Sequence, residues 1–421
     1  MALPIYYFHH SKISKKIHPP LLYCLRSVTS FLPIAGRKQG VSCKLKLVPS
    51  SHTIAMPIYM DVHIVPGVKA KNVAEAHRQD LLHQDEYGCK CMTYWIDETR
   101  ESIFCLIEAP DKDAVKEMHR KAHGLIPHKI VEVSSSVVQA FLGRIYDPEE
   151  AETTSEGLKI FSDPSFRILL VTKTADPLLL QHKVGRDKAM RLLREHNLIV
   201  RRNTTEFEGA EVEHPGAGFI LSFSSAAKAV ACAIAIEQDL PQSLSNALDF
   251  KMSLNSGEPI QRSNKLFGDT IQKAQFMCSL GGYFRVALTS SVKDLVAKEP
   301  INTNNSRFLM LTPQDEIFLE KLCSSLEENY ENPDFDVEEC GKRMTMSRSQ
   351  FYRKTMALTH HAPNALLKEF RLEKAKELLK KGQHTVSQVS FDCGFTSPSY
   401  FTKCFKKKFG LLPASYVQLI K

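Results

Sequence analysis

Two short units with the same layout, close to the C-terminus, constrain the fold more than any other feature of this chain. Residues 336–359 and 385–410 each have the pattern of a short helix, a tight turn and a second helix, which starts after Ser347 in the first unit and after Ser397 in the second. Serine is a preferred N-cap because its hydroxyl accepts a hydrogen bond from an unpaired N–H of the first helical turn. A helix, a tight turn and a second, basic helix make a helix-turn-helix motif. Residues 301–421 are therefore predicted to fold as an all-α double helix-turn-helix domain.

One long helix over residues 363–381 is expected to join the two units. Its nineteen residues span about 28 Å at the helical rise of 1.5 Å per residue. That length approaches the roughly 34 Å between major-groove segments on one face of B-DNA. A single rigid helix can thus place two recognition helices in successive grooves. Upstream, apolar side chains at positions 317, 318, 322 and 326 have the spacing of a buried helix stripe.

The charge of the chain is distributed unevenly. The net charge is +8, of which residues 1–55 contribute +8 and residues 341–421 contribute +12, so that residues 56–340 carry −12. A basic C-terminal segment beside an acidic body indicates a polyanionic partner, with nucleic acid as the first candidate. A basic surface that is merely solvated is the alternative that charge alone leaves open.

The C-terminal phrases MSRSQFYRK, FRLEKAKELL and VSFDCGFTSPSYFTKCFKKKFGLLPASY resemble the DNA-binding domain of the AraC/XylS family over residues 314–421. The resemblance implies that the second helix of each motif reads base edges in double-stranded DNA while nearby lysines contact phosphates. The base-facing residues that it implies are Ser349, Gln350, Tyr352 and Arg353 in the first motif and Pro398, Ser399, Thr402 and Lys403 in the second. The phosphate-facing residues that it implies are Lys354, Lys406 and Lys407. Thr355 and the pair His360 and His361 depart from the family pattern.

Residues 56–146 show strand and helix patterns in the order β-α-β-β-α-β, which is typical of a ferredoxin-like α/β sandwich. The first helix pattern, KNVAEAHRQDLLHQDEYG, is expected to place Val73, Ala76, Leu81 and Leu82 on one apolar side.

The phrases HRQDLLHQDEYG, YWIDE and FCLIEAPDKDAV in this segment resemble a family of small α/β domains of which at least some members bind nickel. The resemblance implies candidate metal ligands at His77, His83, Asp85, His119 and His123. His119 and His123 are four residues apart, which places both on one face of a helix. A helical histidine pair that is only solvated remains the alternative. No other cofactor is expected.

Residues 147–163 are polar and acidic without periodicity, and they are predicted to be a linker. Residues 164–300 then alternate strand and helix patterns again. Their phrases KMSLNSGE and LFGDTIQKAQFMCSL resemble the class III nucleotide cyclase fold. The fold class predicted for the whole chain is therefore multidomain α+β, with a ferredoxin-like sandwich, a cyclase-like α/β domain and an all-α double helix-turn-helix.

The active-site positions that the cyclase resemblance implies are altered together. Cyclase chemistry needs two aspartates that hold metal ions, and their positions carry Lys173 and Ala217. Glu213 stands at the base-reading lysine, while Gln272 and Phe276 stand at the transition-state Asn and Arg. The sequence therefore predicts a catalytically inactive domain, kept for homodimerisation or ligand sensing, and a protein that is not an enzyme.

The remaining features concern the compartment. The eleven cysteines are scattered, and Cys89 and Cys91 have no second pair at zinc-site spacing, so reduced thiols are expected. No run of eighteen apolar residues is present, so no membrane partner is expected. Residues 1–55 are expected to be a disordered or mis-started extension outside the fold. Together these features predict a cytoplasmic protein.

The leading hypothesis is a sequence-specific DNA-binding transcriptional regulator whose upstream domains sense a ligand or dimerise. Two alternatives stay open: a nucleotide cyclase with an accessory DNA-binding domain, and a nickel-binding protein with such a domain. Salt-dependent, sequence-selective DNA binding distinguishes the regulator from the metal-binding protein. Product formation from ATP or GTP distinguishes it from the cyclase.

Overall fold

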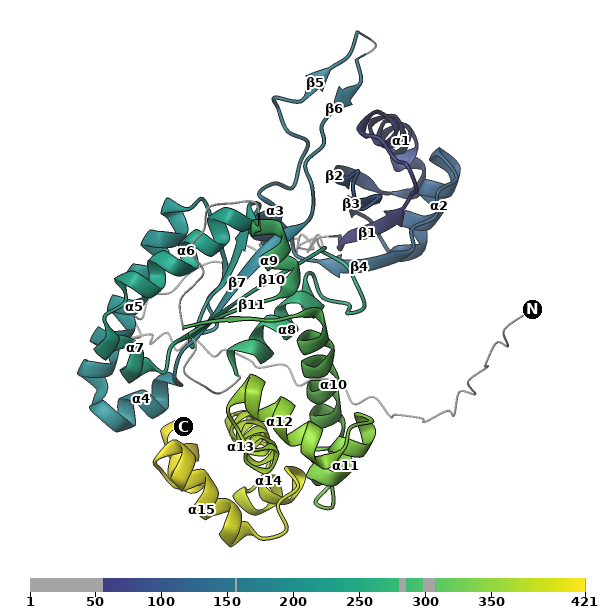
Figure 1. Ribbon diagram of the computed structural model, residues 1–421. Helices are drawn as coiled ribbons and strands as arrows, with labels where there is room; N and C mark the ends of the chain where they lie inside the picture. Colours follow the sequence, from purple (N-terminus) through teal and green to yellow (C-terminus); the bar gives the residue numbers. More distant parts are fainter. Residues whose placement is uncertain (1–55, 156, 280–284, 298–306, 421) are drawn as a thin grey trace, which may run out of the picture. The chain divides into compact units, whose positions relative to one another are not determined.

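The computed structural model describes residues 56–155, 157–279, 285–297 and 307–420. The expectation for residues 1–55 lies outside them. The N-terminal domain contains a four-stranded antiparallel sheet in the order β2-β3-β1-β4, with two helices on one side of it (Figure 1). Its elements are β1 (Ile58–Ile64), α1 (Ala70–His83), β2 (Lys90–Asp97), β3 (Ser102–Glu108), α2 (Lys112–Ala122) and β4 (Lys129–Val133). The predicted β-α-β-β-α-β order is confirmed.

The buried side of α1 differs from the prediction. Val73 is buried as expected, but Leu81 and Leu82 are 41% and 66% exposed. The helix instead buries the polar residues His77 and Asp80. These two side chains have buried polar partners, described below, that offset the loss of water. The polar contacts therefore set the rotation of this helix, and the apolar pattern at its end does not.

The segment predicted as a linker contains regular structure. A short helix, α3 (Ser135–Leu142), precedes it, and within it β5 (Glu152–Thr153) and β6 (Lys159–Ile160) pair as a small antiparallel hairpin. The linker predicted over residues 147–163 thus contains a short hairpin. The left-handed Gly157, with φ of 77°, lies in the turn that this polar sequence forms.

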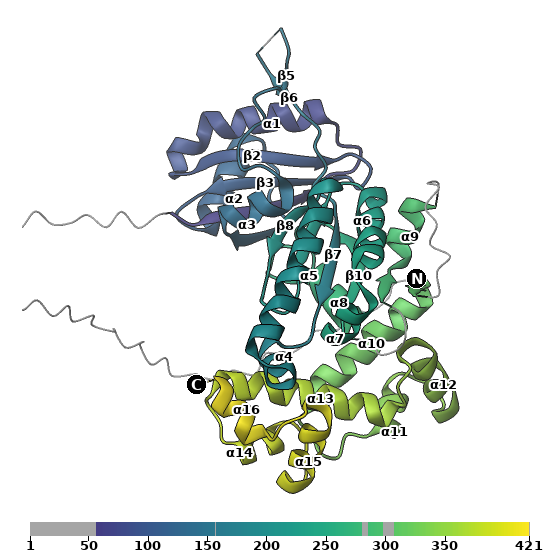
Figure 2. The same cartoon turned by 90° about the vertical axis from the view of Figure 1, so that its left-hand side faces the viewer.

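The middle domain is built on a six-stranded mixed sheet in the order β12-β11-β10-β7-β9-β8. Its strands are β7 (Arg167–Lys173), β8 (Ala210–Glu213), β9 (Ile220–Phe223), β10 (Lys251–Gly257), β11 (Val286–Leu288) and β12 (Phe308–Met310). Its helices are α4 (Pro177–Val184), α5 (Arg186–Glu206), α6 (Ala226–Asp239), α7 (Gln242–Leu248), α8 (Gly268–Cys278) and α9 (Ser290–Val296). The helices α5 and α6 run along the sheet (Figure 2). Strand β12 joins this sheet although it lies beyond the boundary predicted at residue 300.

Alternate residues of the central strand β7 belong to two different cores. Ile168 and Leu170 are buried with residues of α5 and α6. Leu169 and Val171 are buried with residues of α8 and with Met60 of the N-terminal sheet. This alternation follows from the two-residue period of a strand. The N-terminal sheet thus shares a hydrophobic core with the middle domain.

The C-terminal domain is all-helical, as predicted. Its helices are α10 (Pro313–Asn329), α11 (Val337–Arg343), α12 (Arg348–Thr359), α13 (Pro363–Lys381), α14 (Val386–Asp392), α15 (Pro398–Phe409) and α16 (Pro413–Ile420). The joining helix α13 has the predicted bounds. The expected apolar stripe on α10 is confirmed at Phe318, Leu322 and Leu326, whereas Ile317 is 53% exposed and was wrongly included. No helix among the described residues is long and apolar enough to cross a bilayer.

The turn of the second motif requires a glycine at position 394, and this makes a first prediction. Gly394 has φ of 72°, and a Cβ there would lie 2.3 Å from the Tyr330 carbonyl oxygen and 2.9 Å from Nε of Arg371. We expect Gly394→Ala to destabilise the second motif by at least about 3 kcal/mol, because the left-handed backbone and the clash both contribute. Amide hydrogen exchange of α14 and α15 in the full chain measures this loss.

Gly382→Ala is the matched control. Gly382 also has a positive φ, of 67°, but its added Cβ would meet no atom within 4 Å. This variant is expected to lose only about 1–2 kcal/mol from the left-handed backbone. Equal losses for the two variants would mean that the contact with Tyr330 does not matter.

Candidate nucleic-acid interface and candidate metal centre

The second helices of the two motifs, α12 and α15, present most of their predicted DNA-contacting residues to solvent. The first motif has its N-cap at Ser347, whose hydroxyl accepts from the Gln350 N–H, and the second has its N-cap at Ser397, whose hydroxyl accepts from the Tyr400 N–H. The exposed candidates are Ser349, Gln350, Tyr352, Arg353, Ser399, Lys403, Lys406 and Lys407. The half-buried candidates are Lys354, Pro398 and Thr402. The opposite side of each helix is anchored by the fully buried Phe351 or by Phe401.

Three of these candidates already have side-chain partners within the protein, and one of them is Ser349, whose hydroxyl lies 3.4 Å from that of Ser347. Lys354 forms an ion pair with Asp315 at the start of α10. The side-chain oxygen of Gln350 accepts from the Ser347 N–H at 3.1 Å and closes a capping box. A contact of Lys354 with phosphate, or of the Gln350 oxygen with a base, would therefore replace an existing bond. Arg353 and Lys403 are the exposed long cations of the two base-facing sets.

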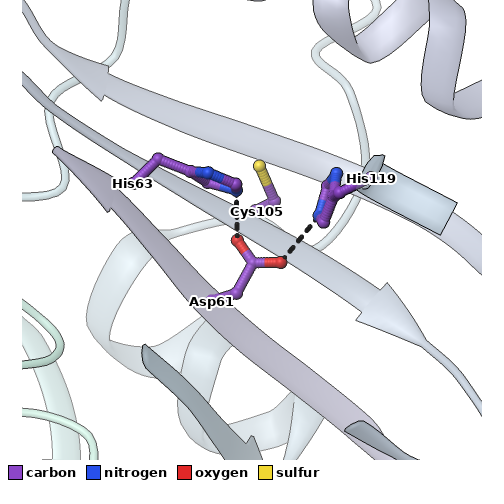
Figure 3. Close-up of side chains that lie close together, drawn as sticks. All are labelled: Asp61, His63, Cys105 and His119. Carbon is purple, nitrogen blue, oxygen red and sulfur yellow. Dashed lines mark hydrogen bonds and ion pairs between the residues drawn. The ribbon is translucent and has the colours of Figure 1, made fainter. Parts of the chain in front are cut away.

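A buried cluster of histidines and carboxylates lies between the N-terminal sheet and its helices. Asp61 and His63 come from β1, Cys105 from β3, and His119 from α2. Figure 3 shows Asp61 between His63 and His119, with the Cys105 sulfur beside them. The Asp61 carboxylate lies 2.9 Å from Nε2 of His119 and 3.3 Å from Nε2 of His63. The strand period puts Asp61 and His63 on one face of β1, and Cys105 is paired with Asp61 across the sheet.

His119 links this group to a second one. Its Nδ1 lies 3.0 Å from Asp80 of α1 and 3.0 Å from Nε2 of His123, and His123 lies 3.2 Å from the same Asp80 oxygen. Burial alone would lower the pKa of His119, but the Asp61 and Asp80 carboxylates on its two sides raise it to about 10. Burial would raise the pKa of Asp61, and the two histidines lower it below its usual value instead. Without a metal, a proton on His119 thus holds the two buried carboxylates together.

The cluster contains some of the ligands expected from the sequence and excludes others. His119 and His123 are members, as predicted. His77 instead lies 3.4 Å from Asp147, and His83 lies 2.9 Å from Glu86. Asp85 is exposed in the short 3-10 helix after α1. The sequence interpretation missed Asp61, His63, Asp80 and Cys105. The D-x-H spacing in the first strand was a signal that could have found two of them, because alternate polar residues share one strand face.

The donor atoms fit a divalent transition metal. Each of the two groups offers nitrogen and carboxylate donors that lie within 4.8 Å of one another. Imidazole suits nickel, copper and zinc, whereas calcium and magnesium prefer sites made of oxygen ligands alone. Asp61 Oδ1 and His63 Nε2 are buried without a well-formed hydrogen bond. Buried polar atoms of this kind are costly unless a ligand satisfies them.

The altered cyclase positions also come together in space. Lys173, Ala217, Gln272 and Phe276 line one cavity of about 470 Å³, whereas Glu213 is not part of its lining. The Lys173 ammonium donates to the Ser279 hydroxyl at 2.9 Å. A cation at this position repels divalent metal ions.

The fold and these sites define a multidomain protein with a tandem helix-turn-helix module and two upstream α/β domains. Residues 340–418 match the model of a helix-turn-helix domain, and residues 59–133 match the model of the nickel-responsive protein SCO4226-like family. The C-terminal part is thus an AraC-type helix-turn-helix domain and the N-terminal part an SCO4226-like domain. Both resemblances stated from the sequence are confirmed.

Among curated proteins, the chain is similar to histidine kinase P4 of Formosa agariphila, with 39% identity over 102 residues, covering 24% of this chain and 7% of that protein. It is also similar to the transcriptional regulator GbdR of Pseudomonas aeruginosa, with 32% identity over 95 residues, covering 23% of this chain and 26% of that protein. The chain thus spans about a quarter or less of the length of these two relatives.

Among solved structures, the DNA-binding domain of AdpA in complex with a target DNA is 34% identical, with a TM-score of 0.23, covering 24% of this chain and 87% of that one. SCO4226 from Streptomyces coelicolor is 31% identical, with a TM-score of 0.18, covering 18% of this chain and 94% of that one. A bacterial light-regulated adenylyl cyclase is 12% identical, with a TM-score of 0.29, covering 57% of this chain and 87% of that one.

Proposed function

We propose that this protein is a sequence-specific transcriptional regulator that acts in the cytoplasm and reads two successive major grooves of double-stranded DNA. The observation that carries the proposal is the pair of capped, basic, exposed helices α12 and α15 on the rigid nineteen-residue helix α13. AdpA, whose DNA-binding domain is 34% identical to this region, is described as a global transcriptional factor. The proposal transfers the DNA-binding role of that domain to this chain.

Both recognition helices carry base-facing residues, and a separate set of lysines faces the phosphates. In α12, Ser349, Gln350, Tyr352 and Arg353 face bases, and in α15 the same role falls to Pro398, Ser399, Thr402 and Lys403. The residues that face phosphates are Lys354, Lys406 and Lys407. Arg353 can make a bidentate contact with guanine, whereas lysines at phosphates add affinity without sequence information.

The test is a selection from random duplex DNA with the purified full chain at physiological salt. We expect enrichment of a motif with two blocks about ten base pairs apart, because adjacent major-groove segments on one DNA face are one helical turn apart. Binding without enrichment would contradict the proposal, since a basic surface alone binds DNA without sequence preference. Analytical ultracentrifugation of the same sample tests homodimerisation through the middle domain, which would double the footprint.

We further propose that the regulator senses a divalent metal, with nickel as the first candidate. Asp61 and His63 alternate along β1 with Met60 and Val62, and these two apolar side chains are buried in the core shared with the middle domain. A metal bound by Asp61 and His63 would therefore lie on one face of β1, while the opposite face of the same strand packs in the core shared with the middle domain. A DNA-binding titration with and without nickel tests this, and identical affinities would contradict it.

The enzyme alternative makes a separate prediction. Ala217→Asp restores one of the two metal-binding aspartates, but we expect no cyclic nucleotide from ATP or GTP with manganese. Lys173 still repels the metal ions, and Gln272 and Phe276 line the same cavity in place of the transition-state residues. Product above that of the unaltered chain would show that the middle domain was aligned wrongly with the cyclases.

A further inference from the structure

Asp176 forms a buried junction between the middle domain and the second helix-turn-helix motif. It precedes α4 as its N-cap and accepts from the Leu178 N–H at 2.9 Å. The other carboxylate oxygen lies 3.2 Å from the Tyr416 hydroxyl of α16 and 2.6 Å from the Lys380 ammonium of α13. Only 4% of the Asp176 side chain is exposed. One carboxylate therefore binds both the first helix of its own domain and two helices of the DNA-binding domain.

The cost of burying this charge makes the contact specific. A buried carboxylate is strongly destabilising unless it is paired and hydrogen-bonded. Burial would raise the pKa of Asp176, but Lys380 and the neighbouring Lys376 lower it, so that the group is ionised. Asp176 thus favours the arrangement in which both partners from the DNA-binding domain are in place.

The same contact extends into the core that holds a recognition helix. Tyr416 is fully buried, and its ring lies 5.9 Å from that of Phe405 in α15. Leu179 of α4 packs against the hydrophobic cluster that contains both aromatic residues. A movement of α4 would therefore change the packing around α15.

We infer that Asp176, with Lys380 and Tyr416, is a latch by which the middle domain holds the second helix-turn-helix motif in its DNA-binding position. The inference rests on the proposed DNA-binding function. Ser399 and Lys403 are exposed while the latch is closed, and the two latch residues of the DNA-binding domain belong to α13 and α16 and not to α15. The closed latch is therefore compatible with DNA and fixes the position of one recognition helix relative to the other.

The test uses two minimal substitutions in the full chain, separately and together. Tyr416→Phe removes one hydroxyl and keeps the buried ring. Asp176→Asn keeps a good N-cap through its amide oxygen, but its NH2 group replaces the oxygen that faces Tyr416 and Lys380, so that both the charge and the acceptor are lost there. We expect amide hydrogen exchange in α16 to rise at least about tenfold in each variant, with a double variant well short of the product of both effects. Unchanged exchange, or fully independent effects, would overturn the latch.

DNA affinity gives the second readout, with Lys381→Met as the matched control for Lys380→Met because Lys381 is its exposed neighbour. We expect the affinity of the Lys380 and Tyr416 variants for the selected site to fall at least about fivefold, with unchanged sequence preference. If amide hydrogen exchange in α16 became faster while the affinity for the selected DNA site stayed the same or rose, the latch would not hold the second motif in its DNA-binding position. An unaltered chain that selects no sequence would instead refute the proposed function, while hydrogen exchange still tests the latch.

Discussion

Arg353→Ala is expected to weaken binding to the selected DNA site by about 1–3 kcal/mol, or roughly five- to 150-fold. The side chain is exposed on α12, two positions after the buried Phe351 that fixes the helix to its domain. Loss of a bidentate contact with guanine removes discrimination at one base position, so binding to random DNA should change much less. Fluorescence anisotropy on the selected and on a scrambled duplex measures both affinities.

Lys403→Ala and Lys407→Ala are the comparison variants for Arg353→Ala. Lys403 belongs to the base-facing set of α15, and its loss is expected to affect the selected site more than scrambled DNA. Lys407, exposed near the end of the same helix, is expected to meet phosphate. Its removal should weaken both complexes about equally and lower the salt slope by about 1. Equal losses on both DNAs for all three variants would disprove the base-contact assignments.

The C-terminal domain was predictable because its signals are local. Ser347 and Ser397 cap helices that begin one residue later, and the bounds of α13 agree with the predicted ones because Pro363 opens it and Gly382 ends it in a left-handed conformation. Such caps depend on a few neighbouring residues. Ile317 fits the apolar spacing of α10 but is exposed, because this spacing gives the direction of the buried face and not its width.

The buried histidine–carboxylate cluster was only half predictable. His119 lies in the last turn of α2 and His123 is the C-cap of that helix, so their i, i+4 spacing could be recognised in the sequence. Asp61 and Cys105 meet only because β1 and β3 pair in one register, which places them opposite each other. Asp80 reaches the cluster because α1 turns its polar side inward, contrary to the apolar pattern. Pairing register and helix rotation are tertiary properties, and a single sequence does not state them.

The latch could not be foreseen at all. Asp176 and Tyr416 are 240 residues apart in the chain. In the sequence, Asp176 stands out only as an acid close to the altered metal position at Lys173. Its environment arises where two domains meet, and no periodicity or cap encodes that contact.

His119→Gln is expected to reduce the affinity of the protein for nickel at least about 100-fold. The imidazole lies between Asp61 and Asp80, so its loss removes a donor that both groups of the cluster share. Isothermal titration calorimetry of the full chain measures the affinity directly. A thermal shift adds an independent readout, since metal at about 100 times its Kd should stabilise the unaltered protein by about 2.7 kcal/mol and the variant by far less.

His83→Gln is the matched control for this experiment. His83 was an equally good ligand candidate in the sequence, but it pairs with Glu86 outside the cluster. Its substitution should leave nickel affinity within about twofold, because neither group of the cluster changes. If His83→Gln abolished binding while His119→Gln retained it, the metal would sit at the surface end of α1 and the buried cluster would be a proton-linked structural core. If both variants bound nickel like the unaltered chain, the metal-sensing proposal would be wrong, because the cluster would then take no part in binding the ion.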